Sequence, residues 1–462
     1  MQIIQGILDL GATIMMPIVL FIMAMIFGQK VGKSLRSSLM VGVAFIGIFA
    51  VLNATLGTIG PAVQALADGL GIDVLGTDIG WPVASAITWS FSWAGLIIPI
   101  GFVVNWIMLG FGWTKTFDAD IWNYWHWTFT AAMTYIWTDN LWLAFALAIV
   151  VEVITIKLGD WTAPLTQKYF GIPGTSLPHT ETVNWAPFNM AIEKAVLSKI
   201  PALQKSKMDT ENLREKIGFW GEPMMLGLYI GLALGIFIWA VSDYSWKIIL
   251  ELGVAIPALI FLEGRMIGIL IDGLTPIVDG VRDTFQKSER FKDREILIGI
   301  DAGPIGLANP ASVVVGMVGI VIYLLLTLII PGYKILPLAD LAIVPIYYMF
   351  AAAASKGNLW KTLINGTLSS LLLLYLTSSF APQLTEAAQL VEYGLPAGVL
   401  LISSIDVGAH LLPWMIIMPV VGIVLGDLNM IIVPLVIAAL WVLAWVYARD
   451  MPEKLAKELD EA

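Results

Sequence analysis

Two apolar stretches of the chain are interrupted in mid-run by Gly, Pro and ionisable residues. The first interruption is GIPGTSLPHTE, residues 171–181, and the second is GIDAGPIGLANP, residues 299–310. Lipid cannot satisfy the backbone N–H and C=O groups that such interruptions free, so non-helical backbone at membrane depth must be buried in protein or line a polar cavity. The interruptions therefore predict two re-entrant segments, at about 160–198 and 296–310, that build a binding site within the membrane.

The composition favours a membrane protein. Hydrophobic residues make up 58% of the 462 residues and charged residues only 13%, against roughly 25% charged residues in soluble domains. Several apolar runs reach the ~20 residues needed to cross a bilayer. The longest polar stretch, residues 199–218, is too short to fold alone, so we expect one integral membrane unit over residues 1–462 and no soluble domain.

The chemistry of the side chains limits the possible cofactors. Cysteine is absent and the three His residues lack a metal-site spacing, so we expect no metal. The sequence has no P-loop, kinase signature or dinucleotide-binding glycine fingerprint, so we expect no nucleotide or other cofactor. Any phosphoryl group must come from a partner protein, which could dock on the mixed-charge loops at about 199–218 and 282–295. The alternative is that these loops only determine topology.

The distribution of Lys and Arg predicts the topology. Basic residues at 30–36 follow the first apolar run and place that loop in the cytoplasm, which leaves the N-terminus outside; basic residues at 449–457 place the C-terminus in the cytoplasm. We expect an all-α polytopic protein of about eleven spans. The expected spans cover residues 10–28, 38–58, 83–110 with a break at Pro99, 121–138, 141–158, 219–241, 247–276, 312–331, 336–354, 359–380 and 429–447. Residues 396–426 break at 408–413 and are expected not to cross fully.

The paired interruptions also suggest internal symmetry. Both are expected to enter from the cytoplasmic side, and a long apolar helix follows each. This arrangement is typical of transporters built from two inverted structural repeats, with the substrate bound near the midplane between them. The two halves share only faint residue identity, so the repeat is a hypothesis about shape.

Polar residues gather at the two interruptions. His179, Thr180 and Glu181 follow Pro178, and Asp301 lies between two Gly residues. These side chains supply donors, acceptors and carboxylates that suit a polyhydroxylated ligand. A buried carboxylate beside a substrate hydroxyl could accept its proton during phosphoryl transfer. Asp301 and Glu181 are therefore the candidate catalytic residues, although Asp301 could have a purely structural role.

Three further residues complete the candidate substrate site. His126 and Thr130 are spaced to share one face of the expected helix 121–138, and Asn309 precedes Pro310 at an expected helix start. Each has a plainer alternative, because His126 could belong to an interfacial aromatic belt and Asn309 could be only an N-cap. His410 is a further candidate, as is a Trp in the third or fourth span.

The segments 171–185, 299–310 and 221–223 resemble the membrane component, enzyme IIC, of the galactitol-specific phosphotransferase system. The similarity extends over nearly the whole chain. The resemblance implies a homodimer in which each protomer has a core domain that holds the substrate and a V-shaped dimerisation domain. It also implies an elevator-like displacement of the core.

The resemblance further implies group translocation at the bacterial inner membrane. A sugar alcohol, galactitol, would be captured outside and phosphorylated by a phosphocysteine on a separate IIB subunit, which is itself supplied by IIA. By motif, the substrate-binding residues of the ascorbate relatives fall on His126, on His179 with Thr180 and Glu181, and on Asp301. Thr180 and Glu181 stand where the ascorbate branch has amides, which favours a different, uncharged substrate.

Two other functions remain as alternatives. An ion-coupled secondary transporter would use the same architecture, with Asp301 or Glu181 carrying the coupling proton. A passive channel is disfavoured because the sequence contains no filter-like repeat. The sequence leaves open which alditol is bound and whether the two carboxylates are ionised.

Overall fold

The computed structural model of the chain describes residues 12–69, 71, 76–206, 208–287, 294–330, 332–337, 339–393 and 400–461. Most of these residues are helical, and six of the described helices are long and apolar enough to cross a membrane. They are α5 (Ala94–Phe111), α7 (Leu141–Tyr169), α12 (Pro223–Val241), α15 (Pro310–Ile329), α18 (Leu359–Leu390) and α21 (Asn429–Ala448). The predicted helical membrane class is confirmed, whereas the total of about eleven spans stays a prediction. The start of the first predicted span, the middle of the loop 282–295 and residues 396–399 lie outside the described residues.

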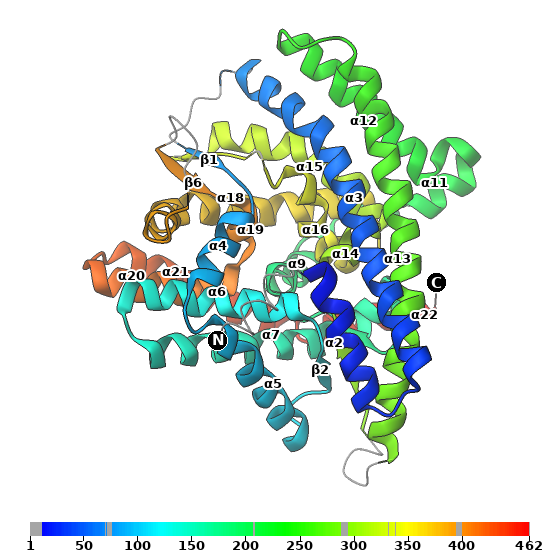
Figure 1. Cartoon of the computed structure of the whole chain (residues 1–462). Helices are drawn as coiled ribbons and strands as arrows, with labels where there is room; N and C mark the ends of the chain where they lie inside the picture. The colour runs from blue at the N-terminus through cyan, green and yellow to red at the C-terminus, as the bar shows by residue number, and fades with distance from the viewer. Residues whose placement is uncertain are drawn as a thin grey trace.

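A layer of long helices forms one side of the molecule (Figure 1). It contains α2 (Ala12–Ile26), α3 (Val31–Gly69), α12 and α13 (Ile248–Lys287). Helices α12 and α13 approach closely at two glycines: a Cβ on Gly231 would lie 2.2 Å from the carbonyl oxygen of Leu252, and one on Gly235 would lie 2.5 Å from the Cα of Ile249. Small residues at such contacts let helix backbones pack closely where lipid gives no hydrophobic driving force.

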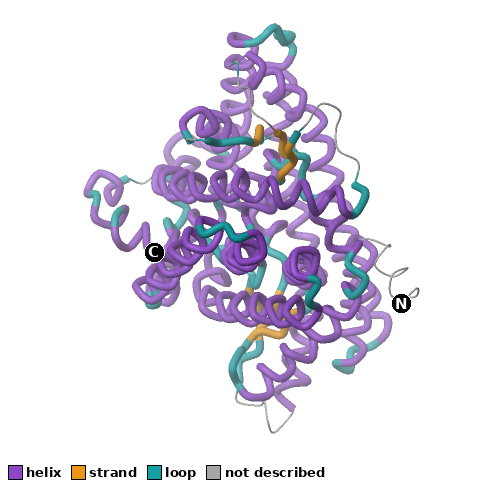
Figure 2. Tube along the Cα trace, turned by 90° about the vertical axis from the view of Figure 1, so that its left-hand side faces the viewer, coloured by secondary structure: helices purple, strands orange, loops and turns teal. Residues whose placement is uncertain are grey.

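Two small parallel sheets lie in separate parts of the remaining body (Figure 2). One has the strand order β5-β1-β6, and the other has the order β2-β4-β3. The strands are β1 (Gly76–Asp78), β2 (Thr116–Asp118), β3 (Thr175–Ser176), β4 (Leu297–Gly299), β5 (Ile335–Leu336) and β6 (Leu401–Ser403). In the first sheet, β1 from the first half of the chain lies between two strands from the second half. In the other sheet, β4 from the second half lies between two strands from the first half, so the two halves exchange one strand each. Thr77 lies opposite both Leu336 and Ile402, and Ile298 lies opposite both Phe117 and Thr175.

A helix follows each strand after a short junction. The helices after β1, β2 and β3 are α4 (Pro82–Ser90), α6 (Ile121–Thr138), and α8 (Thr180–Val183) with α9 (Ala186–Ala195). Those after β4, β5 and β6 are α14 (Gly303–Ala308), then η3 (Leu341–Ile343) with α16 (Val344–Tyr347) and α17 (Met349–Ala354), and finally α19 (Ile405–Ala409) with α20 (Leu411–Leu425). Side-chain caps start two of these helices: Asp120 accepts from the N–H of Trp122 at the start of α6, and Ser404 accepts from the N–H of Val407 at the start of α19. Strand pairing and caps thus satisfy the backbone where the helices are interrupted.

Two features of the predicted spans are wrong. Residues 336–354 do not form one helix; they form the end of β5 followed by η3, α16 and α17. The helix is interrupted because Pro345 lies at the start of α16 and because Asp340 accepts hydrogen bonds from backbone N–H groups of other junctions. The predicted break at Pro99 is also absent: Pro99 lies inside α5, and the chain breaks instead at residues 91–93. The expected break at 408–413 is present, since α19 ends at Ala409 and α20 begins at Leu411.

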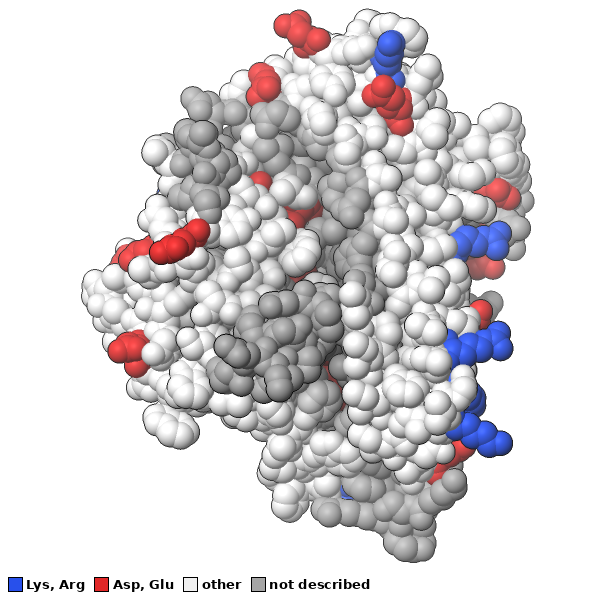
Figure 3. All heavy atoms as spheres, in the orientation of Figure 1, with Lys and Arg blue, Asp and Glu red and all other residues white. Residues whose placement is uncertain are grey.

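The predicted polar loop 199–218 contains short helices in its described part. These are η1 (Leu197–Lys199), α10 (Pro201–Lys205), α11 (Thr210–Ile217) and η2 (Gly218–Gly221). On the face seen in Figure 3, Lys and Arg gather mainly at the right-hand edge, on the side where Figure 1 places the C-terminus, whereas much of the Asp and Glu lies at the left and top. The predicted topology rests on the asymmetry of Lys and Arg, since Asp and Glu contribute little to orientation.

Helix α22 (Met451–Asp460) closes the C-terminal side against α7 and α9. Lys194 pairs with Asp450, and Lys168 pairs with Asp460. The hydrogen bond from Lys194 lowers the pKa of the exposed Asp450 carboxyl. Exposed ion pairs of this kind stabilise little, so the buried side chains of α22, Leu455 among them, fix the helix in place.

The close packing of α15 against α16 gives a test of the fold. A Cβ on Gly316 would lie 2.4 Å from the Cα of Pro345. We expect Gly316→Ala to lower the free energy of unfolding by about 1–3 kcal/mol, because the two helices must move apart. Thermal unfolding of the purified protein in detergent measures this loss.

The matched control is Gly57→Ala in α3, where a Cβ meets nothing within 4 Å. Alanine in a helix interior is favoured over glycine by up to ~1 kcal/mol, so the melting temperature should not fall. Equal melting temperatures for the two variants would contradict the packing described here.

Candidate functional site

A cavity lies where the strand–helix junctions of the two sheets meet. Its wall combines aromatic rings with ionisable groups from segments that are far apart in the sequence. The lining residues are Trp81, Trp122, Trp125, His126, His179, Glu181, Asp301, Gly303, Pro304, Leu307, Ile343, Ile346 and Asp406. Both predicted interruptions contribute to this wall, as do the junctions after β1, β2, β5 and β6.

The first polar pair in the cavity joins the two predicted interruptions. His179 Nε2 lies 3.2 Å from Asp301 Oδ1, and His179 Nδ1 lies 3.1 Å from the hydroxyl of Thr182. Asp301 Oδ1 also accepts from the N–H of Gly303 at 2.8 Å, while the N–H of Asp301 donates to Asp120 Oδ2 at 2.8 Å. These contacts fix the Asp301 carboxylate at one edge of the cavity.

A second pair lies beside the first. His126 Nε2 lies 3.3 Å from Glu181 Oε1, and both side chains are at least nine-tenths buried. On its other side, His126 Nδ1 lies 2.7 Å from His410 Nε2, and His410 Nδ1 lies 2.8 Å from the backbone oxygen of Asp406. The rings of His126 and His179 are 4.9 Å apart, so all three histidines of the chain converge here.

Asp340 anchors the junctions that follow the strands of the other sheet. Its Oδ1 accepts from the N–H of Trp81 at 3.2 Å. Its Oδ2 accepts from the hydroxyl of Ser404 at 2.6 Å and from the N–H of Asp406 at 3.1 Å. Its own N–H donates to Asp78 Oδ2 at 3.0 Å. One buried carboxylate therefore positions two cavity-lining residues, Trp81 and Asp406.

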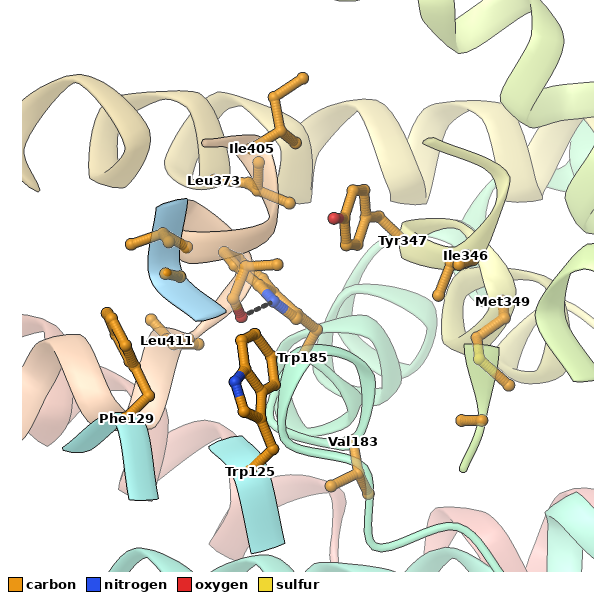
Figure 4. Packing of buried hydrophobic residues seen from close by; sticks show 14 of the residues in the cluster. Trp125, Phe129, Val183, Trp185, Ile346, Tyr347, Met349, Leu373, Ile405 and Leu411 are labelled. Atoms are coloured by element: carbon orange, nitrogen blue, oxygen red, sulfur yellow. Dashed lines mark hydrogen bonds between the residues drawn. The ribbon is translucent and has the colours of Figure 1, made fainter. Parts of the chain in front are cut away.

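Three tryptophans supply the aromatic part of the wall. The rings of Trp81, Trp122 and Trp125 meet edge to face, with centroids 5.7–6.4 Å apart. The indole N–H groups of Trp122 and Trp125 are buried and find no acceptor among the residues that the structure describes. Behind Trp125, Trp185 donates from Nε1 to the backbone oxygen of Ala409 at 2.9 Å (Figure 4). The three tryptophans thus give the cavity an aromatic, largely apolar side.

The seven predicted substrate residues fall into two groups. His126, His179, Glu181 and Asp301 line the cavity. The other three lie outside its lining. Thr130 donates to the backbone oxygen of His126 at 3.4 Å, Thr180 is buried in α8, and Asn309 is the N-cap of α15, where it accepts from the N–H of Ser312 at 3.0 Å.

Several residues of the site were missed by the sequence analysis. Asp120, Asp340 and Asp406 lie in segments that resemble the predicted interruptions, because each follows a short strand: Asp120 and Asp340 come directly before a helix, and Asp406 lies in the first turn of α19. The signal that could have found them is an Asp close to Pro or Gly inside an apolar run, as in residues 337–345 and 403–413. The cavity-lining Trp81, Trp122 and Trp125 lie in or beside the third and fourth predicted spans, where a Trp was a candidate for ligand contact.

Three side chains of the site could hold a metal ion by geometry alone. Ligand atoms of His126, Glu181 and His410 lie within 4.8 Å of one another, and all three residues are buried. The donor set of two imidazoles and one carboxylate suits a divalent transition metal. The sequence-based expectation of no metal stays a prediction.

Asp340 gives a test of how the cavity is built. Asp340→Ala leaves the N–H groups of Trp81 and Asp406 without their acceptor, and each buried unsatisfied group costs about 1–3 kcal/mol. We expect a clear fall in melting temperature together with weaker ligand binding. Glu386→Ala removes an exposed carboxylate from α18 and should change neither property. A variant at Asp340 with unchanged stability would remove this residue from the framework of the site.

Comparison with known proteins gives the family. The family described as PTS system sugar-specific permease component matches residues 6–398. The chain is 33% identical over 416 residues to the PTS system galactitol-specific EIIC component of Escherichia coli strain K12, with 90% of each chain covered. The protein of the same description from Escherichia coli O157:H7 is equally similar, at 33% over 416 residues. These matches confirm the resemblance seen in the sequence, and the chain therefore belongs to the family of PTS system sugar-specific permease components.

Proposed function

We propose that this permease component takes up galactitol across the bacterial inner membrane and presents it for phosphorylation by a separate phospho-IIB subunit. The observation that carries the proposal is the pair of buried His–carboxylate contacts, His179–Asp301 and His126–Glu181, on the wall of one aromatic-lined cavity. The galactitol-specific description of the relatives supports the substrate class.

The chemistry of the wall suits an uncharged sugar alcohol. Ionised carboxylates accept hydrogen bonds from hydroxyl groups, and imidazoles can accept or donate, so the His and carboxylate side chains of the wall can bind several hydroxyls. Trp faces can cover the C–H surface of the ligand. Our proposed substrate-binding residues are the four predicted residues that line the cavity, His126, His179, Glu181 and Asp301. Thr130, Thr180 and Asn309 lie outside the lining, so their predicted contact with the substrate would need a rearrangement of the site.

In the proposed reaction, a substrate hydroxyl oxygen attacks the phosphorus of a phosphocysteine on IIB. The new O–P bond forms as the S–P bond breaks, the hydroxyl proton passes to Asp301, and the thiolate remains on IIB. The phosphorylated cysteine must belong to a partner because this chain has no cysteine. Glu181 is the second proposed catalytic carboxylate.

The architecture proposed for transport rests on the exchanged strands. Each sheet has two outer strands from one half of the chain and a central strand from the other half. This reciprocal arrangement supports two inverted repeats, with re-entrant segments at about 160–198 and 296–310. The layer of α2, α3, α12 and α13 would be the V-shaped dimerisation domain of a homodimer, and the remaining helices the core that moves as an elevator. The N-terminus would lie outside and the C-terminus in the cytoplasm, with the loops 199–218 and 282–295 available to IIB and IIA.

An ion-coupled secondary transporter is the second candidate. It is favoured by the same buried carboxylates, since Asp301 or Glu181 could carry a coupling proton. The two functions differ in their product. Proteoliposomes that contain this protein and phosphorylated IIB should accumulate galactitol phosphate, whereas a symporter would accumulate free galactitol without IIB and respond to an uncoupler. Competition by sorbitol, mannitol and ascorbate then tests the choice of substrate.

Asp301→Asn tests the catalytic proposal. An amide cannot take the hydroxyl proton, so phosphorylation should fall by about 10²–10⁴-fold while measurable galactitol binding remains. Asp427→Asn, an exposed carboxylate in the turn before α21, is the isosteric control. Phosphorylation at the wild-type rate by the Asp301 variant would exclude this residue from proton transfer.

His179→Ala tests the binding proposal. It removes a ring that contacts Asp301 and lines the cavity, and a lost hydrogen bond to a charged group is worth about 1.5–3 kcal/mol. We expect the dissociation constant for galactitol, measured by calorimetry, to rise by roughly 10–100-fold. The control is Thr134→Val, which removes a hydroxyl bonded to the backbone of α6 outside the cavity. Equal affinities for the two variants would contradict a ligand contact at His179.

A further inference from the structure

We propose that His410 is a positioning residue that fixes the protons of His126, so that a single exchangeable proton is held between His126 and Glu181 at the cavity wall. His410 itself does not line the cavity. Only the consequence for catalysis rests on the proposed function; the proton arrangement follows from hydrogen-bond geometry and can be tested without substrate.

The argument begins at the backbone of α19. His410 Nδ1 lies 2.8 Å from the carbonyl oxygen of Asp406. A carbonyl oxygen can only accept, so His410 Nδ1 must carry the hydrogen. In a neutral imidazole the other nitrogen is then bare, so His410 Nε2 is an acceptor.

The next link is the contact between two histidines. His410 Nε2 lies 2.7 Å from His126 Nδ1, and two bare nitrogens would not approach so closely. With both rings neutral, His126 Nδ1 therefore donates to His410. The backbone carbonyl of Asp406 always accepts, so it sets the direction of both hydrogen bonds in this pair of neutral rings.

The last link reaches the cavity. With a hydrogen on Nδ1, the Nε2 of a neutral His126 has a lone pair, and it lies 3.3 Å from Glu181 Oε1. A lone pair facing an ionised carboxylate would be repulsive in this buried site, so one proton lies between the two atoms. The Glu181 carboxyl also contacts the Asp406 carboxyl on the same wall, and two adjacent carboxyls likewise favour a proton on Glu181. Whether that proton sits on nitrogen or on oxygen, the pair of side chains carries no net charge.

Packing holds His410 in the orientation that this chain requires. Only 1% of its surface is exposed. Its ring lies 6.0 Å from that of Trp125 and 5.4 Å from that of Phe129, both on α6. The neighbouring carbonyl of Ala409 is bonded to Trp185 Nε1, which fixes the backbone between α19 and α20 (Figure 4).

The consequence for the reaction is the charge of the wall. Without His410, a neutral His126 could carry its hydrogen on Nε2 and donate to an ionised Glu181, which would leave the pair with one negative charge. With His410 the pair holds one proton more and is neutral. A neutral pair at this part of the wall suits an uncharged polyol, and it keeps a proton within reach of the substrate hydroxyls.

Solid-state NMR of the ¹⁵N-histidine-labelled full-length protein in lipid bilayers tests the proton arrangement directly. The chain has three histidines, so single variants assign every signal, and ¹⁵N shifts separate protonated from bare ring nitrogens. We expect His126 and His410 both to carry hydrogen on Nδ1. A bare Nδ1 on His126 would overturn the proposal, as would zinc that stays bound through purification and coordinates the two rings.

Substitutions at His410 test the positioning role. His410→Gln offers a carbonyl that can accept from His126, whereas His410→Phe offers no acceptor. We expect His126 to keep its Nδ1 hydrogen in the Gln variant and to move it to Nε2 in the Phe variant, with phosphorylation at least about tenfold slower in Phe than in Gln. The matched control on α20 is Trp414→Phe, which loses a 3.0 Å hydrogen bond to Ser379 and should leave His126 unchanged.

The readouts separate the two proposals. If the Phe variant does not fold, the wild-type and Gln spectra still decide the proton arrangement. Equal phosphorylation rates in folded Gln and Phe variants would overturn the positioning role. An NMR result as expected, in a protein that accumulates only free galactitol, would support the proton arrangement and exclude the proposed phosphorylation.

Discussion

The structure depends on satisfying backbone groups where apolar helices are interrupted. Short parallel strands pair the interrupted segments, and buried carboxylates take the N–H groups that remain at the junctions, as Asp120 does for Asp301 and Asp340 does for Trp81 and Asp406. Polar backbone that lipid could not tolerate thereby becomes the framework of a cavity. The side chains that face the cavity are held by this framework, and their chemistry follows from it.

The two strongest interruptions could be found from sequence because they place Gly, Pro and ionisable residues in one short run. They gave His179, Glu181 and Asp301, which the structure brings to one wall together with His126. The interruption at residues 335–354 was missed, since its polar content is a single Asp among apolar residues that resemble an ordinary span. Asn309 shows the opposite case: the same residue pattern that suggested a ligand contact also describes an N-cap, and hydrogen-bond geometry was needed to see the cap.

Contacts between distant segments could not be predicted from one sequence. The partnership of His126 with His410 joins α6 to the end of α19, and no local pattern in either segment refers to the other. The same holds for Trp81, which meets Trp122 and Trp125 only because β1 pairs with strands of the second half of the chain. The local sequence predicted which residues are candidates for a functional site, whereas the contacts among these residues depend on the tertiary structure.

The exchange of central strands bears on how the protein is made. In the sheet, Gly76 pairs with Ile335 and Leu401, so during synthesis β1 emerges long before either flanking strand exists. Contacts of such long sequence separation form slowly. The first half of the chain must therefore enter the membrane while both sides of β1 are still unpaired, and its part of the cavity is completed only when the second half has been made.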